Sequence, residues 1–394
     1  MSRHDDTATV TAALAQRTGT RAQDWFLVLK ARYGMEVVFR ALREVHGAGH
    51  VVTQIVTCST AVTPILVAGL TPVHGDVSAA TVSLDPDRLE VGATTRAVVV
   101  QHTFGIVDHE SARRVADLAR GVGALVVEDC AHGLGRMATD AAGDPLADVS
   151  VHSFGVEKML PTRFGGAIWV NPAGADPEVR DRVVAALRDL PVAGPRLDLV
   201  TRAYRGQVAV LNRLPAAVAG PLRRGLTALR LFEPAVAPAE GRATLPYRPM
   251  RPSAWVVEQV AAALPRLPEI ERARGAVVTA YLASLDGVVE VPAGVRPGDP
   301  LVRLPFLAAD GAAAERTIAA LRAAGVYAGS WYRPALFPGV EDPRAYGYTP
   351  GDPRLVTSED VVARVVNLPT TGDPEQARRA AEVVRSATAA GGSS

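Results

Sequence analysis

The stretch 124–171 constrains the fold of this 394-residue chain more than any other part. It contains three short apolar runs rich in β-branched residues, Ala124–Glu128, Val149–Phe154 and Ala167–Val170. Continuous apolar runs of this length are typical of strands buried on both faces of a parallel sheet. In an open α/β sheet, ligands bind outside the carboxyl ends of the strands. We therefore expect the polar side chains just after these runs to face a binding site.

Four such side chains differ in chemistry. Asp129 ends the first run and His132 comes three residues later, while Ser153 and Lys158 belong to the end of the second run and the turn after it. This set fits pyridoxal 5′-phosphate (PLP): a lysine forms a Schiff base with the cofactor, a carboxylate keeps the pyridine nitrogen protonated, and small polar groups hold the phosphate. We predict Lys158 as the catalytic residue, and Asp129, His132 and Ser153 as cofactor contacts.

The same segments resemble the DegT/StrS family of sugar aminotransferases, which are fold-type I PLP-dependent enzymes. Members carry E-D-x-A-[HQ], S-F-x-x-x-K and G-G-A, which read here Glu128–His132, Ser153–Lys158 and Gly165–Ala167. Each motif alone is weakly specific, whereas their order and spacing together are strongly specific. The resemblance implies a mostly parallel central sheet with helices on both faces, a smaller α+β C-terminal domain, and a homodimer with active sites at the interface.

The start of the first long helix is expected to meet the cofactor phosphate. A glycine-containing turn after the strand Trp25–Leu29 can present backbone N–H groups and a positive dipole end to an anion. Family members usually have a glycine and a small hydroxyl residue before this helix, whereas this chain has Arg32, Tyr33 and Gly34. Arg32 can contact the phosphate as a charged fork or lie in solvent at the helix start. We count all three residues as candidate cofactor contacts.

Two more cofactor contacts come from the resemblance alone. Cys58 stands where members often have an aromatic residue that stacks on the cofactor ring, so the ring is either packed by this smaller group or covered from elsewhere. A buried cysteine that acts as a small hydrophobic residue is the alternative. Arg251 lies in the segment Tyr247–Ser253, which resembles the family segment that reaches across the dimer, and would contact the partner's phosphate.

Other residues near these motifs have two readings each. Trp331, Tyr332 and Arg333 lie where substrate-facing residues of the family usually occur, although aromatic core packing fits them equally well. Glu157 would raise the pKa of the neighbouring lysine amine if it pointed into the pocket, so we expect it to point outward.

The chain is long enough for two domains, which we predict at 1–240, for PLP binding, and 245–390, a smaller domain. The segment 197–243 departs from the family and alternates apolar residues with arginines. Read as helices it is basic and amphipathic, which suits peripheral membrane contact through 197–232, an oligomer interface or a helical lid.

Composition excludes several classes. The formal net charge of +1, with acids and bases interspersed, gives no reason to expect nucleic-acid binding. Two cysteines, Cys58 and Cys130, are too few for a disulfide framework or a zinc site, and they suit a reducing cytoplasm. We predict no metal site. The N-terminus has no signal-peptide pattern, and no apolar run is long enough for a membrane span, so a cytoplasmic location is expected.

The resemblance implies transamination: an amino donor, with glutamate as the expected one, gives its nitrogen to a nucleotide-linked keto-sugar or a similar cyclic ketone of a natural-product pathway. Three alternatives stay open. A PLP-dependent dehydratase of this family typically has histidine in place of the lysine, which Lys158 argues against. A PLP lyase or C–C bond-forming enzyme would keep every cofactor residue, and a non-catalytic member would not retain the cofactor. A nicotinamide enzyme is disfavoured because no G-x-G-x-x-G comes after the first strand.

Overall fold

A seven-stranded sheet forms the centre of the molecule, as the computed structural model shows for residues 3–391. The strand order is β1-β7-β6-β5-β4-β2-β3. The strands are β1 (Trp25–Val28), β2 (His50–Thr53), β3 (Thr71–His74), β4 (Thr95–Gln101), β5 (Leu125–Asp129), β6 (Val149–Ser153) and β7 (Gly166–Val170). Only β7 runs antiparallel to its neighbours, β1 and β6, and the other pairings are parallel. The mostly parallel sheet is confirmed.

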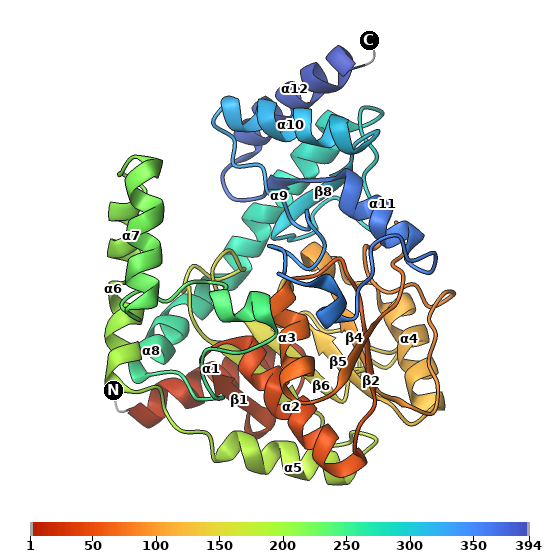
Figure 1. Ribbon diagram of the computed structural model, residues 1–394, viewed down its shortest axis with the longest axis vertical. Coiled ribbons are helices and arrows are strands. Elements are labelled where there is room, and N and C mark those ends of the chain that lie inside the picture. The colour runs from red at the N-terminus through yellow and green to blue at the C-terminus, as the bar shows by residue number, and fades with distance from the viewer. Residues whose placement is uncertain (1–2, 392–394) are drawn as a thin grey trace.

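Helices cover both faces of this sheet (Figure 1). They are α1 (Arg3–Thr18), α2 (Ala31–His46), α3 (Ser59–Val67), α4 (His109–Gly121) and α5 (Pro177–Arg188). Successive strand residues point to opposite faces, and β5 shows the result: Val127 packs in the core shared with α2, α3 and α5, whereas Val126 packs with α4. The unbroken apolar runs therefore reflect burial on both sides.

The C-terminal part of the chain is a smaller α+β body. Two antiparallel strands, β8 (Arg303–Leu307) and β9 (Val365–Pro369), pack with helices that come before and after them in the chain. The helices are α9 (Leu267–Leu285), α10 (Gly311–Ala323), α11 (Val356–Arg364) and α12 (Pro374–Gly391), whereas α8 (Ala254–Ala263) packs against α1 beside the large sheet. This body contacts the carboxyl edge of the large sheet, where the backbone N–H of Val302, just before β8, donates to the Phe104 carbonyl beyond β4.

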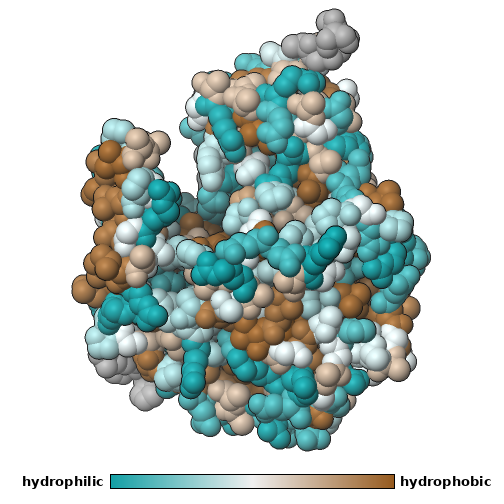
Figure 2. All heavy atoms as spheres, viewed as in Figure 1, coloured by the Kyte–Doolittle hydropathy of each residue, from teal (hydrophilic) through white to brown (hydrophobic). Residues whose placement is uncertain are grey.

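Two helices project from the body of the protein. They are α6 (Pro195–Leu211) and α7 (Ala216–Ala228), and together they form an antiparallel pair that we call the hairpin, defined as residues 195–232. Figure 1 shows it standing apart from the C-terminal body, and Figure 2 shows apolar residues gathered along its outer side. No helix within residues 3–391 combines the length and apolarity needed to cross a bilayer.

Candidate active site

A cavity of about 320 Å³ lies at the carboxyl ends of β1, β5 and β6. Six of the nine predicted site residues line it together: Lys158, Asp129, His132, Ser153, Arg32 and Cys58. They converge because β1, β5 and β6 run in the same direction, so their carboxyl ends share one edge of the sheet. The structure does not bring Tyr33, Gly34 and Arg251 to this cavity.

The Gly165-Gly166 pair allows the start of α2 to reach this edge. A Cβ atom on Gly166 would lie 2.8 Å from the Ala31 nitrogen and 2.9 Å from the His152 carbonyl oxygen, both of them backbone atoms. Gly165 has a φ of 101°, in the region that favours glycine. The two glycines thus place the first turn of α2 beside the end of β6, where Ser153 lies.

Lys158 presents a buried amine to the cavity. Burial lowers the pKa of this amine, while the charges of the neighbouring Asp129 and Glu157 oppose the shift. The Nζ atom lies 5.3 Å from the centre of the Trp331 ring. A lysine whose pKa is lowered has a larger uncharged fraction near neutral pH, and the uncharged amine is the nucleophilic form.

Asp129 is a buried carboxyl group at the end of β5. Its Oδ1 atom accepts a hydrogen bond of 2.9 Å from the backbone N–H of Ala131. Burial raises the pKa of Asp129, because the loss of solvation outweighs that hydrogen bond and the nearby positive charge of Lys158. Within residues 3–391 Asp129 forms no ion pair, so it would be available to accept a hydrogen bond from a cationic N–H in the cavity.

His132 is held as a neutral imidazole. Burial lowers its pKa well below the usual range, and the charges of Lys158 and Arg303 lower it further. Its Nδ1 atom accepts a hydrogen bond of 3.0 Å from the Phe104 backbone N–H, so the ring proton of the neutral form resides on Nε2. The Trp331 ring lies parallel to it, 5.0 Å away and inclined by 6°. The orientation of the imidazole is thus fixed from two sides.

A second buried amine, Lys30, lies in the same cavity and was not predicted from the sequence. Its Nζ pairs with the carboxylate of Glu233 and donates to the Pro234 carbonyl at 3.0 Å. Beside it, Arg32 pairs with Glu240 and donates to the Ala235 carbonyl at 2.8 Å. A signal for Lys30 was available, because Lys30 and Lys158 are the two lysines of a chain with forty arginines.

Tyr33, Gly34 and Arg251 have other surroundings. Tyr33 is fully buried, in a cluster with Leu29. A Cβ atom on Gly34 would lie 2.2 Å from Cδ1 of Ile168, so this glycine lets α2 pack closely on β7. The guanidinium of Arg251 donates to the Leu190 carbonyl at 2.8 Å. A role for Arg251 at a partner's site stays a prediction.

Residues from the C-terminal body close one side of the cavity. Trp331, Tyr332 and Tyr327 line it, so the first two face the site as well as packing with other aromatic rings. Arg333, in contrast, binds Glu315 and the Val362 and Ala363 carbonyls. It therefore anchors the loop that carries the aromatic residues.

Glu157 does not simply point outward, contrary to the expectation. It lies on the cavity wall, where its Oε1 accepts a hydrogen bond of 3.0 Å from the Tyr327 hydroxyl and its Oε2 lies 3.6 Å from the Arg303 guanidinium. The Glu157 charge opposes the lowering of the Lys158 pKa, but burial has the larger effect, so the pKa of Lys158 is lowered overall.

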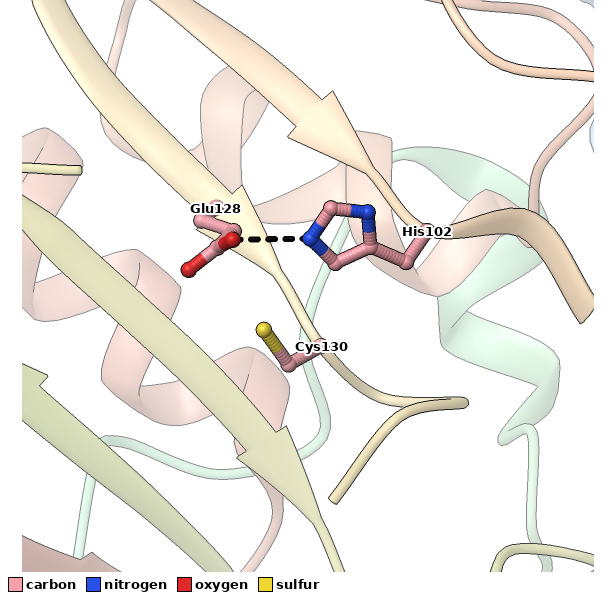
Figure 3. A group of neighbouring side chains, drawn as sticks. All are labelled: His102, Glu128 and Cys130. Atoms are coloured by element: carbon pink, nitrogen blue, oxygen red, sulfur yellow. Dashed lines mark hydrogen bonds and ion pairs between the residues drawn. The ribbon is translucent and has the colours of Figure 1, made fainter. Parts of the chain in front are cut away.

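A group of three potential metal ligands lies just behind Asp129: His102, Glu128 and Cys130 (Figure 3). Their polar atoms already bind protein groups. Glu128 accepts hydrogen bonds from the His102 ring at 2.7 Å, from the Ser150 hydroxyl and from the Ala138 backbone, and Cys130 donates to the Arg136 carbonyl at 3.4 Å. Burial alone would raise the pKa of Glu128, but the hydrogen bonds lower it overall. The group thus ties the ends of β4, β5 and β6 together beneath the cavity.

The residues present fit PLP. The cavity brings a buried amine of lowered pKa, Lys158, near a buried carboxyl group, Asp129, and an imidazole that can donate from Nε2. At its other end, Ser153 and Arg32 lie beside the start of α2, whose N-cap residue, Lys30, makes no side-chain capping hydrogen bond. The first-turn amides of α2 and the guanidinium can therefore meet an anion.

Comparison with known proteins supports this view of the site. The model of the DegT/DnrJ/EryC1/StrS aminotransferase family matches residues 28–218. The resemblance to this family is confirmed. The matched range of the aminotransferase family contains all six predicted residues that line the cavity, and it ends inside α7, before Arg251.

Individual relatives cover different shares of the chain. It is 30% identical over 135 residues to the spore coat polysaccharide biosynthesis protein SpsC of Bacillus subtilis, covering 34% of this chain and 33% of SpsC. It is 31% identical over 187 residues to the dTDP-3-amino-3,4,6-trideoxy-alpha-D-glucose transaminase of Micromonospora megalomicea, covering 45% and 46% of the two chains. The matches thus span less than half the length of these relatives.

Solved structures extend the likeness to nearly the whole chain. The aminotransferase TlmJ of Streptoalloteichus hindustanus superimposes with a TM-score of 0.70, covers 98% of this chain and 92% of its own, and is 23% identical. At 23% identity this similarity is evidence for the fold alone. It confirms the expected fold-type I architecture, including the smaller C-terminal body.

Proposed function

We propose that this protein is a PLP-dependent aminotransferase that moves an amino group from an amino acid, with glutamate as the expected donor, to a keto-sugar. The observation that carries the proposal is the shared cavity of Lys158, Asp129 and His132 within a segment that matches an aminotransferase family. The acceptor would be a nucleotide-linked keto-sugar or a similar cyclic ketone, in keeping with the transaminase name of the relative from Micromonospora.

Lys158 would attach the cofactor and transfer protons. PLP, when bound, supplies an aldehyde carbon that joins to amines and a ring that withdraws electrons from the bond being broken. Burial lowers the pKa of the Lys158 amine, which favours the uncharged form that would attach the cofactor. Once released by an incoming donor, the same Nζ can take a proton from the donor carbon and return it elsewhere.

Asp129 and His132 would hold the ring end of the cofactor. The Asp129 carboxylate would accept a hydrogen bond from a protonated ring nitrogen, and this ionic contact would offset the burial that raises its pKa. His132 would donate from Nε2, since Nδ1 is occupied by the Phe104 N–H. Trp331, which lies parallel to His132, and the smaller Cys58 would limit access of water to this end.

The phosphate end would be held by Ser153, Arg32 and the first turn of α2. Two cationic side chains, Lys30 and Arg32, lie at this end of the cavity. Lys30 pairs with Glu233, and Arg32 pairs with Glu240. We further propose a homodimer in which Arg251 reaches the partner's phosphate, and a cytoplasmic location. The domain limits 1–240 and 245–390 stay part of this proposal.

Lysine labelling tests the proposal directly. The protein is incubated with PLP, reduced with borohydride and analysed by peptide mass spectrometry, which can find the cofactor on only two lysine side chains. We expect the label on Lys158, an absorbance band of bound PLP that Lys158→Arg abolishes, and loss of this band when glutamate is added. Absence of PLP uptake would refute the proposal and favour a non-catalytic member of the family. Uptake without a response to glutamate or other amino donors would point to lyase chemistry.

A further inference from the structure

The hairpin, residues 195–232, exposes a row of large apolar side chains. Six are exposed, up to 67% for Leu199 and 70% for Leu229, and the six are Leu199, Val210, Val218, Leu222, Leu229 and Leu231. Val218, Leu222 and Leu229 are spaced by four and seven residues and so share one side of α7. None of the residues of α7, all of which the structure describes, is buried. Exposed apolar side chains gathered in this way mark an interaction surface.

The hairpin is also strongly basic. It contains seven arginines and one acid, Asp198, and thus has a formal net charge of +6 in a protein whose total is +1. Asp198 pairs with Arg202. Within residues 3–391, the side chains of Arg223 and Arg224 have no carboxylate partner. They directly follow Leu222 in the sequence, so cationic side chains occupy the same helical turn as the apolar row, on the other sides of α7.

The base of the hairpin is well anchored, so its exposed face is not a sign of local unfolding. Tyr204 packs between Phe164 and Phe232, with ring centres 5.1 and 5.3 Å away. The Arg205 guanidinium donates a hydrogen bond to the Pro161 carbonyl. The chain then continues from Phe232 into Glu233, which pairs with Lys30 in the cavity wall. The projecting surface is therefore rigidly connected to the candidate active site.

We propose that the hairpin docks peripherally on an anionic lipid bilayer. The apolar row enters the boundary between head groups and acyl chains, and the arginines bind lipid phosphates. The net charge of +6 favours an anionic surface and disfavours a symmetric contact between the hairpins of two copies, which would bring two equal charges together. The projecting, convex shape in Figures 1 and 2 suits a flat surface better than a groove. This docking does not depend on the cofactor.

Vesicle sedimentation of the full-length protein tests the proposal. Vesicles of phosphatidylcholine with about a third phosphatidylglycerol are compared with vesicles of phosphatidylcholine alone, at low and high salt. Each arginine near such a surface contributes roughly fivefold to the binding constant. We expect binding to the anionic vesicles that weakens with salt, and a loss of tenfold or more, as an order-of-magnitude estimate, in the double variant Arg223→Glu/Arg224→Glu.

Two further variants separate the contribution of apolar contact to vesicle binding from that of the overall net charge. Leu222→Glu/Leu229→Glu is expected to reduce binding on the order of tenfold through loss of apolar contact. Arg316→Glu/Arg378→Glu changes the net charge by the same amount on exposed residues of α10 and α12, and should alter binding less than about twofold. Equal loss in this control, or no binding to anionic vesicles, would overturn the proposal. So would a dimer in sedimentation velocity that Leu222→Glu/Leu229→Glu dissociates, because a second copy would then cover the row.

Discussion

Replacing Glu233 by glutamine removes the carboxylate that faces Lys30 and keeps the size of the side chain. Both side chains of this ion pair are almost completely buried. Removal of one partner of a buried pair typically costs about 3–5 kcal/mol, because the remaining charge is left without compensation. We expect about 3 kcal/mol here, the lower end, because the Pro234 carbonyl still accepts from Lys30.

The sign of the pH dependence is a further part of this prediction. Burial lowers the pKa of Lys30, and the charges of Glu233 and Glu240 oppose the shift. Without the Glu233 charge, the pKa falls further in the folded state. A lysine with a lower pKa in the folded than in the unfolded state binds fewer protons when folded, so the free energy of unfolding rises with pH between the two values. The deficit of Glu233→Gln should therefore shrink as the pH rises from neutral toward the ordinary pKa of lysine, about 10.4.

Thermal unfolding followed by circular dichroism measures both effects. At roughly 2.1 cal/mol/K per residue, a chain of this length has an unfolding entropy near 0.8 kcal/mol/K, so 3 kcal/mol corresponds to about 4 °C. The control is Glu375→Gln, which breaks an exposed pair with Arg379 on α12 and should cost less than about 0.5 kcal/mol. Equal shifts for the two variants, or a deficit that grows with pH, would refute the reasoning.

Two other substitutions test residues outside the catalytic set. Gly166→Ala should cost about 3 kcal/mol and lower the melting temperature, because its Cβ would press on two backbone groups that cannot move independently. The control is Gly225→Ala in α7, where a Cβ meets no atom within 4 Å; it should be neutral or stabilising. Asp76 is buried, but hydrogen bonds from Ser358 and Thr357 outweigh the burial and lower its pKa; its stabilising effect should therefore be lost as the pH falls below about 4. Asp76→Asn should flatten the acid side of the stability profile while costing about 1–2 kcal/mol at neutral pH, and an unchanged acid profile would contradict this.

The sequence located Asp129 and Lys158 because both come after buried strands, and the carboxyl ends of parallel strands meet at one edge. Only the period of the apolar residues and the chemistry of the polar residues at the end of each run are needed for this prediction. The same two strands set the positions of Ser153 and His132, which were therefore predicted equally well.

Other residues of the site could not be predicted from their position after a buried strand. Lys30 and Glu233 are separated by 203 positions, and they meet because of how the segment after α7 returns to the sheet. Gly34 was predicted to contact the phosphate because glycine is common in phosphate-binding turns. It instead lies against Ile168, and this contact depends on which side of α2 faces β7. Glu157 was misplaced because its compensating partners, Arg303 and Tyr327, come from the other body of the protein.

The place of β7 in the sheet has a consequence for the order of folding. Within the described residues, β1 pairs with β7 alone, and β7 lies about 140 residues later in the chain. At synthesis rates of roughly 5–20 residues per second, the first strand waits on the order of ten seconds for its partner. Until Gly166–Val170 has left the ribosome, neither Lys30 nor the first turn of α2 has the backbone it rests on. The part of the cavity encoded first is therefore completed only after β7 has been made.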